Sequence, residues 1–129
     1  MRFAKLVFLV AGIYGLIVML PQYFLEGRIG VDTPPPVTHP EFYYGFIGVT
    51  VAWQVLFLFL SSNPVRYRPM IIPAILEKIT FVGAIIVLVL QERVSSLMLA
   101  PASGDLLLGI LFVAAYVKTR QNPATEWTA

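Results

Sequence analysis

The sequence predicts an all-α integral membrane protein, an antiparallel bundle of four transmembrane helices forming a single domain over residues 1–129. Hydrophobic residues make up 58% of the 129 positions and charged residues only 12%, against about 25% charged residues in an average soluble protein. The apolar residues are gathered into four long runs, and a helix needs about 20 such residues to cross a bilayer. A chain so poor in charge offers no basic surface to nucleic acid, so its predicted surroundings are lipid.

The first predicted span covers residues 3–20, and Lys5 is its only charge. It is similar to a signal peptide, but no A-x-A-like cleavage site is present and three more spans follow, so we interpret it as an uncleaved signal anchor. The second span covers residues 42–60 and contains no charged residue. Three consecutive prolines at 34–36 lie between the two spans, and they predict a stiff, extended strap.

The third predicted span covers residues 70–90 and holds Glu77 and Lys78 in its first half. The fourth covers residues 101–117 and places Asp105 about one turn inside its outer end. Nine- and ten-residue loops precede these two spans, and loops this short join antiparallel neighbours.

The positive charges predict the orientation, because Lys and Arg are enriched in cytoplasmic loops. Six of them flank the spans on the side of both termini: Arg2, Lys5, Arg66, Arg68, Lys118 and Arg120. The other side has only Arg28 and Arg93, together with the acidic residues Glu26, Asp32, Glu41, Glu92 and Asp105. We therefore expect cytoplasmic termini and a solvated acidic rim outside, in a bacterial inner membrane. The single histidine has no recognised metal-ligand spacing, so no metal is assigned.

The second span opens with residues that are assigned structural roles. Thr38 and Glu41 fit a capping box around His39, in which Thr38 accepts a hydrogen bond from the Glu41 amide and Glu41 reaches back. Aromatic residues at 42–44 follow directly, as expected of an interfacial belt.

Polar residues inside the spans are the candidate ligand-binding site. Gln54 and Glu77 lie about 9 and 10 Å inside the cytoplasmic edge at about 1.5 Å per residue, so they are expected to meet. Thr50 and Thr80 continue the two polar faces, and Trp53 lies beside Gln54. Intramembrane carboxylates are costly. Glu77 therefore either fixes the helix packing, binds a ligand or handles protons, unless the span boundary is misplaced and leaves it exposed.

The neighbours of these residues have two interpretations each. Lys78 points about 100° away from Glu77 around the helix, and we expect it to snorkel to the cytoplasmic headgroups. Trp53 either packs in the core or against lipid, or stacks on a flat ligand, with Phe57 and Phe81 as apolar walls.

The function predicted first is that of a non-enzymatic accessory or structural subunit, in a homo-oligomer or a larger membrane complex. The chain has no cysteine and no catalytic motif, so neither catalytic residues nor a cofactor are assigned. Small residues that allow close helix approach favour this interpretation: Gly12, Gly15, Gly45, Gly48, Ala52, Gly83, Ala84, Gly109 and Ala114. The alternative is a binder or carrier of a lipid, sterol or quinone; a proton-coupled small transporter is a third option.

The run 38–46 (THPEFYYGF) and the pair Glu77-Lys78, together with four spans and cytoplasmic termini, resemble the small bacterial DoxX-like membrane proteins. The resemblance implies a four-helix membrane fold. It also implies an accessory role beside membrane oxidoreductases, since such families are either of unknown function or accessory subunits of this kind.

Overall fold

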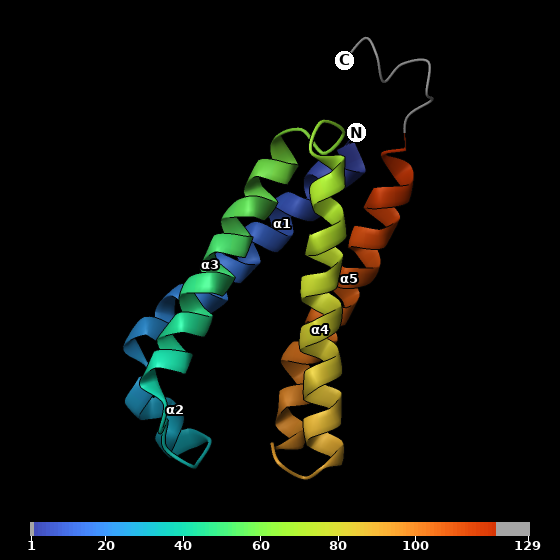
Figure 1. Ribbon diagram of the computed structural model, residues 1–129. Helices are drawn as coiled ribbons and strands as arrows, with labels where there is room; N and C mark the ends of the chain where they lie inside the picture. Colours follow the sequence, from blue (N-terminus) through green and yellow to red (C-terminus); the bar gives the residue numbers. More distant parts are fainter. Residues whose placement is uncertain (1, 121–129) are drawn as a thin grey trace.

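The computed structural model describes residues 2–120, which contain four long helices and no strand (Figure 1). The helices are α1 (Arg2–Met19), α3 (Pro40–Ser62), α4 (Ile71–Leu90) and α5 (Leu99–Lys118). With the short turns that adjoin three of them, all four are long and apolar enough to cross a membrane. The predicted all-α fold of a four-helix membrane protein is thereby confirmed. The outermost positions of the predicted domain, residues 1 and 121–129, lie outside the described residues.

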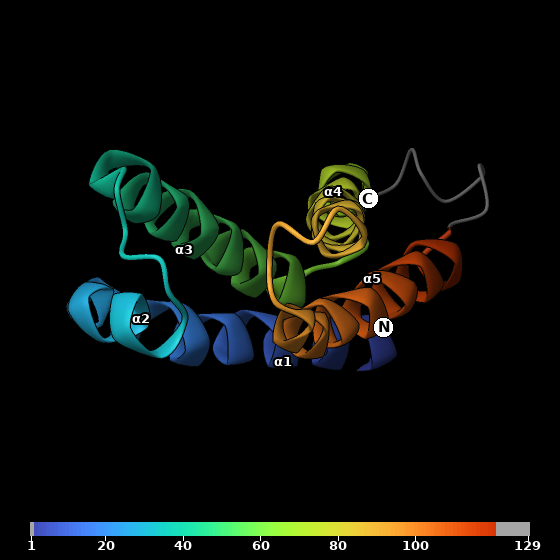
Figure 2. The same cartoon turned by 90° about the horizontal axis from the view of Figure 1, so that it is seen from below.

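The four helices pack as two pairs. α1 lies along α3, α4 lies along α5, and α1 also contacts α5. α3 and α4 follow one another in the chain but scarcely touch. The start of α1, the α3–α4 connection and the end of α5 lie at one end of the molecule, and the pairs diverge toward the other end (Figure 1). Seen along this direction, α3 and α4 stand apart while α1 and α5 close the opposite side (Figure 2).

An aromatic core joins three helices where the pairs converge. Phe8, Phe57 and Phe112 are fully buried, and the ring centroid of Phe112 lies 4.7 Å from that of Phe8 and 5.0 Å from that of Phe57. Nearby, the Arg68 guanidinium donates a 3.0 Å hydrogen bond to the Tyr116 carbonyl oxygen. These contacts join the two pairs at the end where they converge.

The connection between α1 and α3 is more helical than the predicted strap. α1 ends at Met19 and continues as a 3₁₀ turn, η1 (Leu20–Phe24), because Pro21 has no backbone N–H for the helical ladder. A short helix, α2 (Glu26–Asp32), follows before the prolines at 34–36. The sequence of these seven residues has no apolar periodicity that would predict a helix.

Two tyrosines fasten this connection to α3. The Tyr43 hydroxyl donates to the Gln22 carbonyl oxygen at 2.6 Å, and the Tyr44 hydroxyl donates to Glu26 Oε2 at 2.8 Å. Both side chains are half-buried rather than exposed in a belt, whereas Phe42 is 70% exposed and faces outward as expected.

The predicted capping box at the start of α3 is wrong. The helix begins at Pro40, and the residue before it, His39, has φ −125° and ψ 76° with no side-chain cap. A residue that precedes proline is driven out of the helical region, so Pro40 must be the first helical position. Thr38 is then one residue too early to cap, and the Phe42 and Tyr43 amides bond to the His39 carbonyl oxygen.

The last span begins earlier than predicted. A 3₁₀ turn, η3 (Ser96–Met98), leads into α5 at Leu99, and Pro101 falls within the first helical turn, where proline is tolerated. Asp105 consequently lies about 9 Å along α5 at about 1.5 Å per residue.

Candidate functional site

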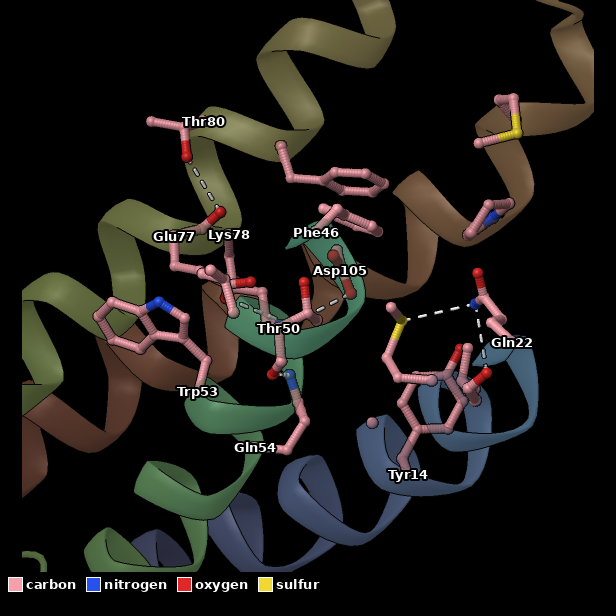
Figure 3. Close-up of a pocket in the computed structure, with 17 residues that line it drawn as sticks. Tyr14, Gln22, Phe46, Thr50, Trp53, Gln54, Glu77, Lys78, Thr80 and Asp105 are labelled. Atoms are coloured by element: carbon pink, nitrogen blue, oxygen red, sulfur yellow. Dashed lines mark hydrogen bonds and ion pairs between the residues drawn. The ribbon is translucent and has the colours of Figure 1, made fainter. Parts of the chain in front are cut away.

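A pocket of about 480 Å³ lies between the two helix pairs, where they diverge (Figure 3). Its walls come from all four long helices and the turns beside them: Tyr14, Gly15, Val18, Met19, Gln22, Phe46, Val49, Thr50, Trp53, Gln54, Glu77, Lys78, Thr80, Phe81, Met98, Pro101 and Asp105. All five residues predicted to bind a ligand (Thr50, Trp53, Gln54, Glu77 and Thr80) are among them.

Three charged side chains meet at one wall of the pocket. Lys78 Nζ lies 3.3 Å from Asp105 Oδ1 and 3.5 Å from Glu77 Oε2, and the exposed fractions of the Lys78, Glu77 and Asp105 side chains are 6%, 18% and 20%. The expected snorkelling of Lys78 is therefore wrong, as is the placement of Asp105 in a solvated rim. Figure 3 shows the three side chains converging from α4 and α5.

Close packing of α4 on α5 explains why Lys78 turns inward. A Cβ atom added to Gly109 would lie 3.3 Å from Lys78 Cβ, so the missing side chain lets α5 approach the lysine stem. The ammonium also lies 5.3 Å from the centre of the Phe57 ring. Asp105 supplies a nearby carboxylate that compensates the buried charge of the ammonium. This pairing stabilises the ammonium more than contact with the lipid headgroups would.

The charges at this wall do not balance. Lys78 donates a hydrogen bond to Asp105 Oδ1, whereas Glu77 Oε2 is buried and, apart from the 3.5 Å ion pair, has no hydrogen-bond partner. A buried acceptor left in this state costs roughly 1–3 kcal/mol. Oε2 itself is enclosed beside the Lys78 ammonium, and the part of the Glu77 side chain that stays accessible (18%) belongs to the lining of the pocket.

Gln54 forms a different wall, between α1 and α3. The residue is 2% exposed, and Nε2 donates to the Thr50 carbonyl oxygen at 3.0 Å. It lies so close over Gly15 that an added Cβ there would overlap its amide group. Gln54 and Glu77 thus line one pocket, but within residues 2–120 no hydrogen bond joins the two side chains, and Gln54 is hydrogen-bonded within its own helix.

The remaining predicted residues have mostly local partners. Thr80 Oγ1 donates to the carbonyl oxygens of Leu76 and Glu77 at 2.9 and 3.1 Å. Phe57 is fully buried in the aromatic core, with its ring centroid 6.5 Å from that of Trp53. Trp53 and Phe81, in contrast, line the pocket.

Sequence reasoning missed Tyr14, which lines the pocket from α1. For Asp105, the sequence predicts a position nearer the outer end of the span than the structure shows. The signal in the sequence that points to Asp105 is Lys78 in the neighbouring predicted span, since intramembrane charges nearly always have a partner.

The predicted polar residues at the outer end stand apart from the pocket. His39 Nδ1 lies 3.3 Å from Glu41 Oε1, and both side chains are about two-thirds exposed (67% and 64%). Arg28 and Asp32 form another exposed pair at 3.3 Å. Within residues 2–120, no group of three or more His, Asp or Glu side chains is placed to hold a metal ion.

No protein-family model, curated protein or solved structure matches this chain. The resemblance to DoxX-like proteins stays a prediction, and the function must be inferred from the pocket.

Proposed function

We propose that this integral membrane protein binds a small lipophilic molecule between its two helix pairs. One observation carries the proposal: a pocket of about 480 Å³ combines apolar walls with a charged cluster deep inside the spans. A fully packed bundle of the same helices would leave no space beside Glu77. Binding sites for small molecules are typically concave and mostly apolar, with a few convergent polar groups.

The route into the pocket supports a ligand that arrives through the bilayer. α3 and α4 diverge and scarcely contact each other (Figures 1 and 2), and residues of both helices line the pocket. Phe46 and Val49 of α3 belong to the lining and are also 49% and 62% exposed. A molecule dissolved among the lipid chains reaches such a site without crossing water.

A pocket-filling variant tests the proposal. Thr50 lines the pocket, so Thr50→Phe fills part of it, whereas Val55→Phe on the same helix adds a similar volume at a position outside the lining. In native mass spectrometry of protein released gently from its own membranes, we expect a small-molecule adduct on the wild type and on Val55→Phe, but not on Thr50→Phe. An adduct of equal occupancy on Thr50→Phe, or none on any form, contradicts the proposal.

A second candidate function, that of an accessory or structural subunit, has its own support. Gly45, Ala52, Gly83 and Ala84 are exposed, and a Cβ added to Gly45 or Gly83 would meet no atom within 4 Å. Outward small residues are suited to close approach by another helix. The same spectra test this role, because a subunit gives a multiple of the chain mass or an attached polypeptide that is lost on Gly45→Leu.

The proposed setting is a bacterial inner membrane with both termini in the cytoplasm. The six positive charges that favour this orientation lie at the end of the molecule where the pairs converge. They are on α1, in the α3–α4 connection with its 3₁₀ turn η2 (Arg68–Met70), and at the end of α5 or two residues beyond it. The compact chain and short loops favour the bacterial membrane.

A further inference from the structure

We propose, building on the lipophilic-ligand function above, that the pocket takes a lipophilic amine in its protonated form, with the ammonium group bound to Glu77. The balance of charge in the pocket is the first argument. Its lining holds two carboxylates, Glu77 and Asp105, and a single cationic side chain, Lys78. In their usual ionisation states these groups leave one negative charge in excess, which a ligand with one positive charge neutralises.

Hydrogen bonding gives the second argument and selects the kind of cation. Lys78 directs its hydrogen bond to Asp105, and the Glu77 Oε2 atom, enclosed beside that ammonium, accepts none from residues 2–120. The remainder of the Glu77 carboxylate lines the pocket, where a ligand reaches it. A protonated amine supplies N–H donors, and a charge-assisted N–H···O bond is about twice as strong as a neutral one. A quinone carbonyl or a carboxylate head offers no donor and leaves Glu77 unsatisfied.

The aromatic residues of the pocket give the third argument. Tyr14, Phe46, Trp53 and Phe81 all belong to its lining. Aromatic faces attract cations through the ring quadrupole, most strongly where water is excluded. In Figure 3 the Trp53 indole points to the side of the pocket where Glu77 and Lys78 lie. The pocket therefore combines aromatic walls, an excess carboxylate and lateral access for an alkyl or aryl tail.

Three probes of equal length separate charge from hydrophobicity: 10-bromodecylammonium, 10-bromodecanol and 10-bromodecanoate. The bromine quenches tryptophan fluorescence at short range, and Trp53 becomes the sole reporter in the Trp127→Phe background. With this protein in lipid nanodiscs, we expect saturable quenching by the ammonium probe at concentrations at least tenfold below those needed for the alcohol. Decanoate is expected to bind more weakly than the alcohol.

The matched variants are Glu77→Gln in the pocket and Glu92→Gln in the exposed α4–α5 connection. Both remove one negative charge, so a general surface effect acts equally in the two. Glu77→Gln is expected to weaken ammonium binding roughly tenfold or more, the size of one charge-assisted hydrogen bond. It should leave alcohol binding within about twofold, and Glu92→Gln should change neither.

The outcomes separate this inference from the proposed function. Equal affinity for ammonium and alcohol, or ammonium binding unchanged by Glu77→Gln, overturns the amine assignment while a lipophilic pocket stands. Tighter binding of decanoate overturns it as well. If no probe gives saturable quenching that Thr50→Phe abolishes, both the amine assignment and the lipophilic-ligand function fail.

Discussion

The Lys78 ammonium has two carboxylates beside it, and each residue of this cluster depends on the others. Removing one member of a buried ion pair leaves its partner as an uncompensated charge, which costs more than the pair itself contributes. Lys78 is 5% exposed and has Asp105 and Glu77 at 3.3 and 3.5 Å. The lysine is therefore the residue whose loss affects the cluster most.

Lys78→Met is expected to lower the free energy of unfolding by about 3–5 kcal/mol. Methionine keeps most of the side-chain length but leaves Glu77 and Asp105 facing each other without a cation. The measurement is reversible unfolding in mixed detergent micelles. In a double-mutant cycle, adding Asp105→Asn should recover part of the loss, because it removes one of the two carboxylates left unpaired.

The control for this prediction is Arg28→Met, which breaks an exposed pair. Arg28 and Asp32 are 77% and 61% exposed, and such pairs contribute about 0–1 kcal/mol. Equal losses for Lys78→Met and Arg28→Met would show that the Lys78 cluster is hydrated and contributes no more than a surface pair.

The sequence predicted the position of this cluster only in part. Depth along the helix placed Gln54 and Glu77 at one level, and both line the pocket. The same reasoning misplaced Lys78 and Asp105, because snorkelling considers one helix at a time. Whether Lys78 pairs with a headgroup or with a carboxylate depends on how closely α5 approaches α4 at Gly109. A single sequence does not specify which helices face each other.

At the scale of the helices, the α1–α3 pairing depends on two glycines. A Cβ added to Gly12 would lie 2.7 Å from Leu58 Cδ2 and 3.0 Å from the Gln54 carbonyl oxygen. One added to Gly15 would overlap the Gln54 side chain. Without a hydrophobic driving force between helices in lipid, close backbone approach supplies much of the association energy.

Gly15→Ala is expected to lower the free energy of unfolding by about 1–3 kcal/mol, the usual cost of overpacking, because Gln54 must leave the wall of the pocket. Gly45→Ala is the matched control, since a methyl group there meets nothing within 4 Å and alanine is the better helix former by about 1 kcal/mol. Thermal unfolding of the two variants in the same detergent checks this. A Gly15→Ala protein as stable as Gly45→Ala would mean that α1 and α3 pack less closely than described.

Hydropathy predicted where the helices lie but not which of them pair. The predicted spans match the observed helices to within a few residues at most ends, because apolar length is a strong local signal. Where an observed helix end differs from the predicted one, a proline is close by: Pro21 follows the end of α1, Pro40 begins α3 and Pro101 lies in the first turn of α5. The divergence of α3 from α4 has no local signal, since it follows from contacts that each helix makes with α1 and α5.

The whole molecule is closed at one end and divided at the other. The aromatic core of Phe8, Phe57 and Phe112 closes the end where α1 begins, and the pocket lies where the two pairs separate. Under the proposed function, a ligand enters this pocket from the side, between α3 and α4, and not through the end that the aromatic core occupies. The orientation of the protein in the bilayer therefore decides from which leaflet a lipophilic molecule enters.

The distribution of positive charge predicts that orientation. The six Lys and Arg residues at the closed end are expected to lie in the cytoplasm, against Arg28 and Arg93 at the divided end. The pocket would then open toward the outer leaflet.

Because the chain has no cysteine, single cysteine substitutions report the topology. Ser62→Cys lies at the closed end and Ser96→Cys at the divided end, and both positions are exposed. A membrane-impermeant maleimide should label Ser96→Cys in intact cells and Ser62→Cys only after permeabilisation. The reverse pattern would place the closed end outside and the entrance of the pocket in the cytoplasmic leaflet.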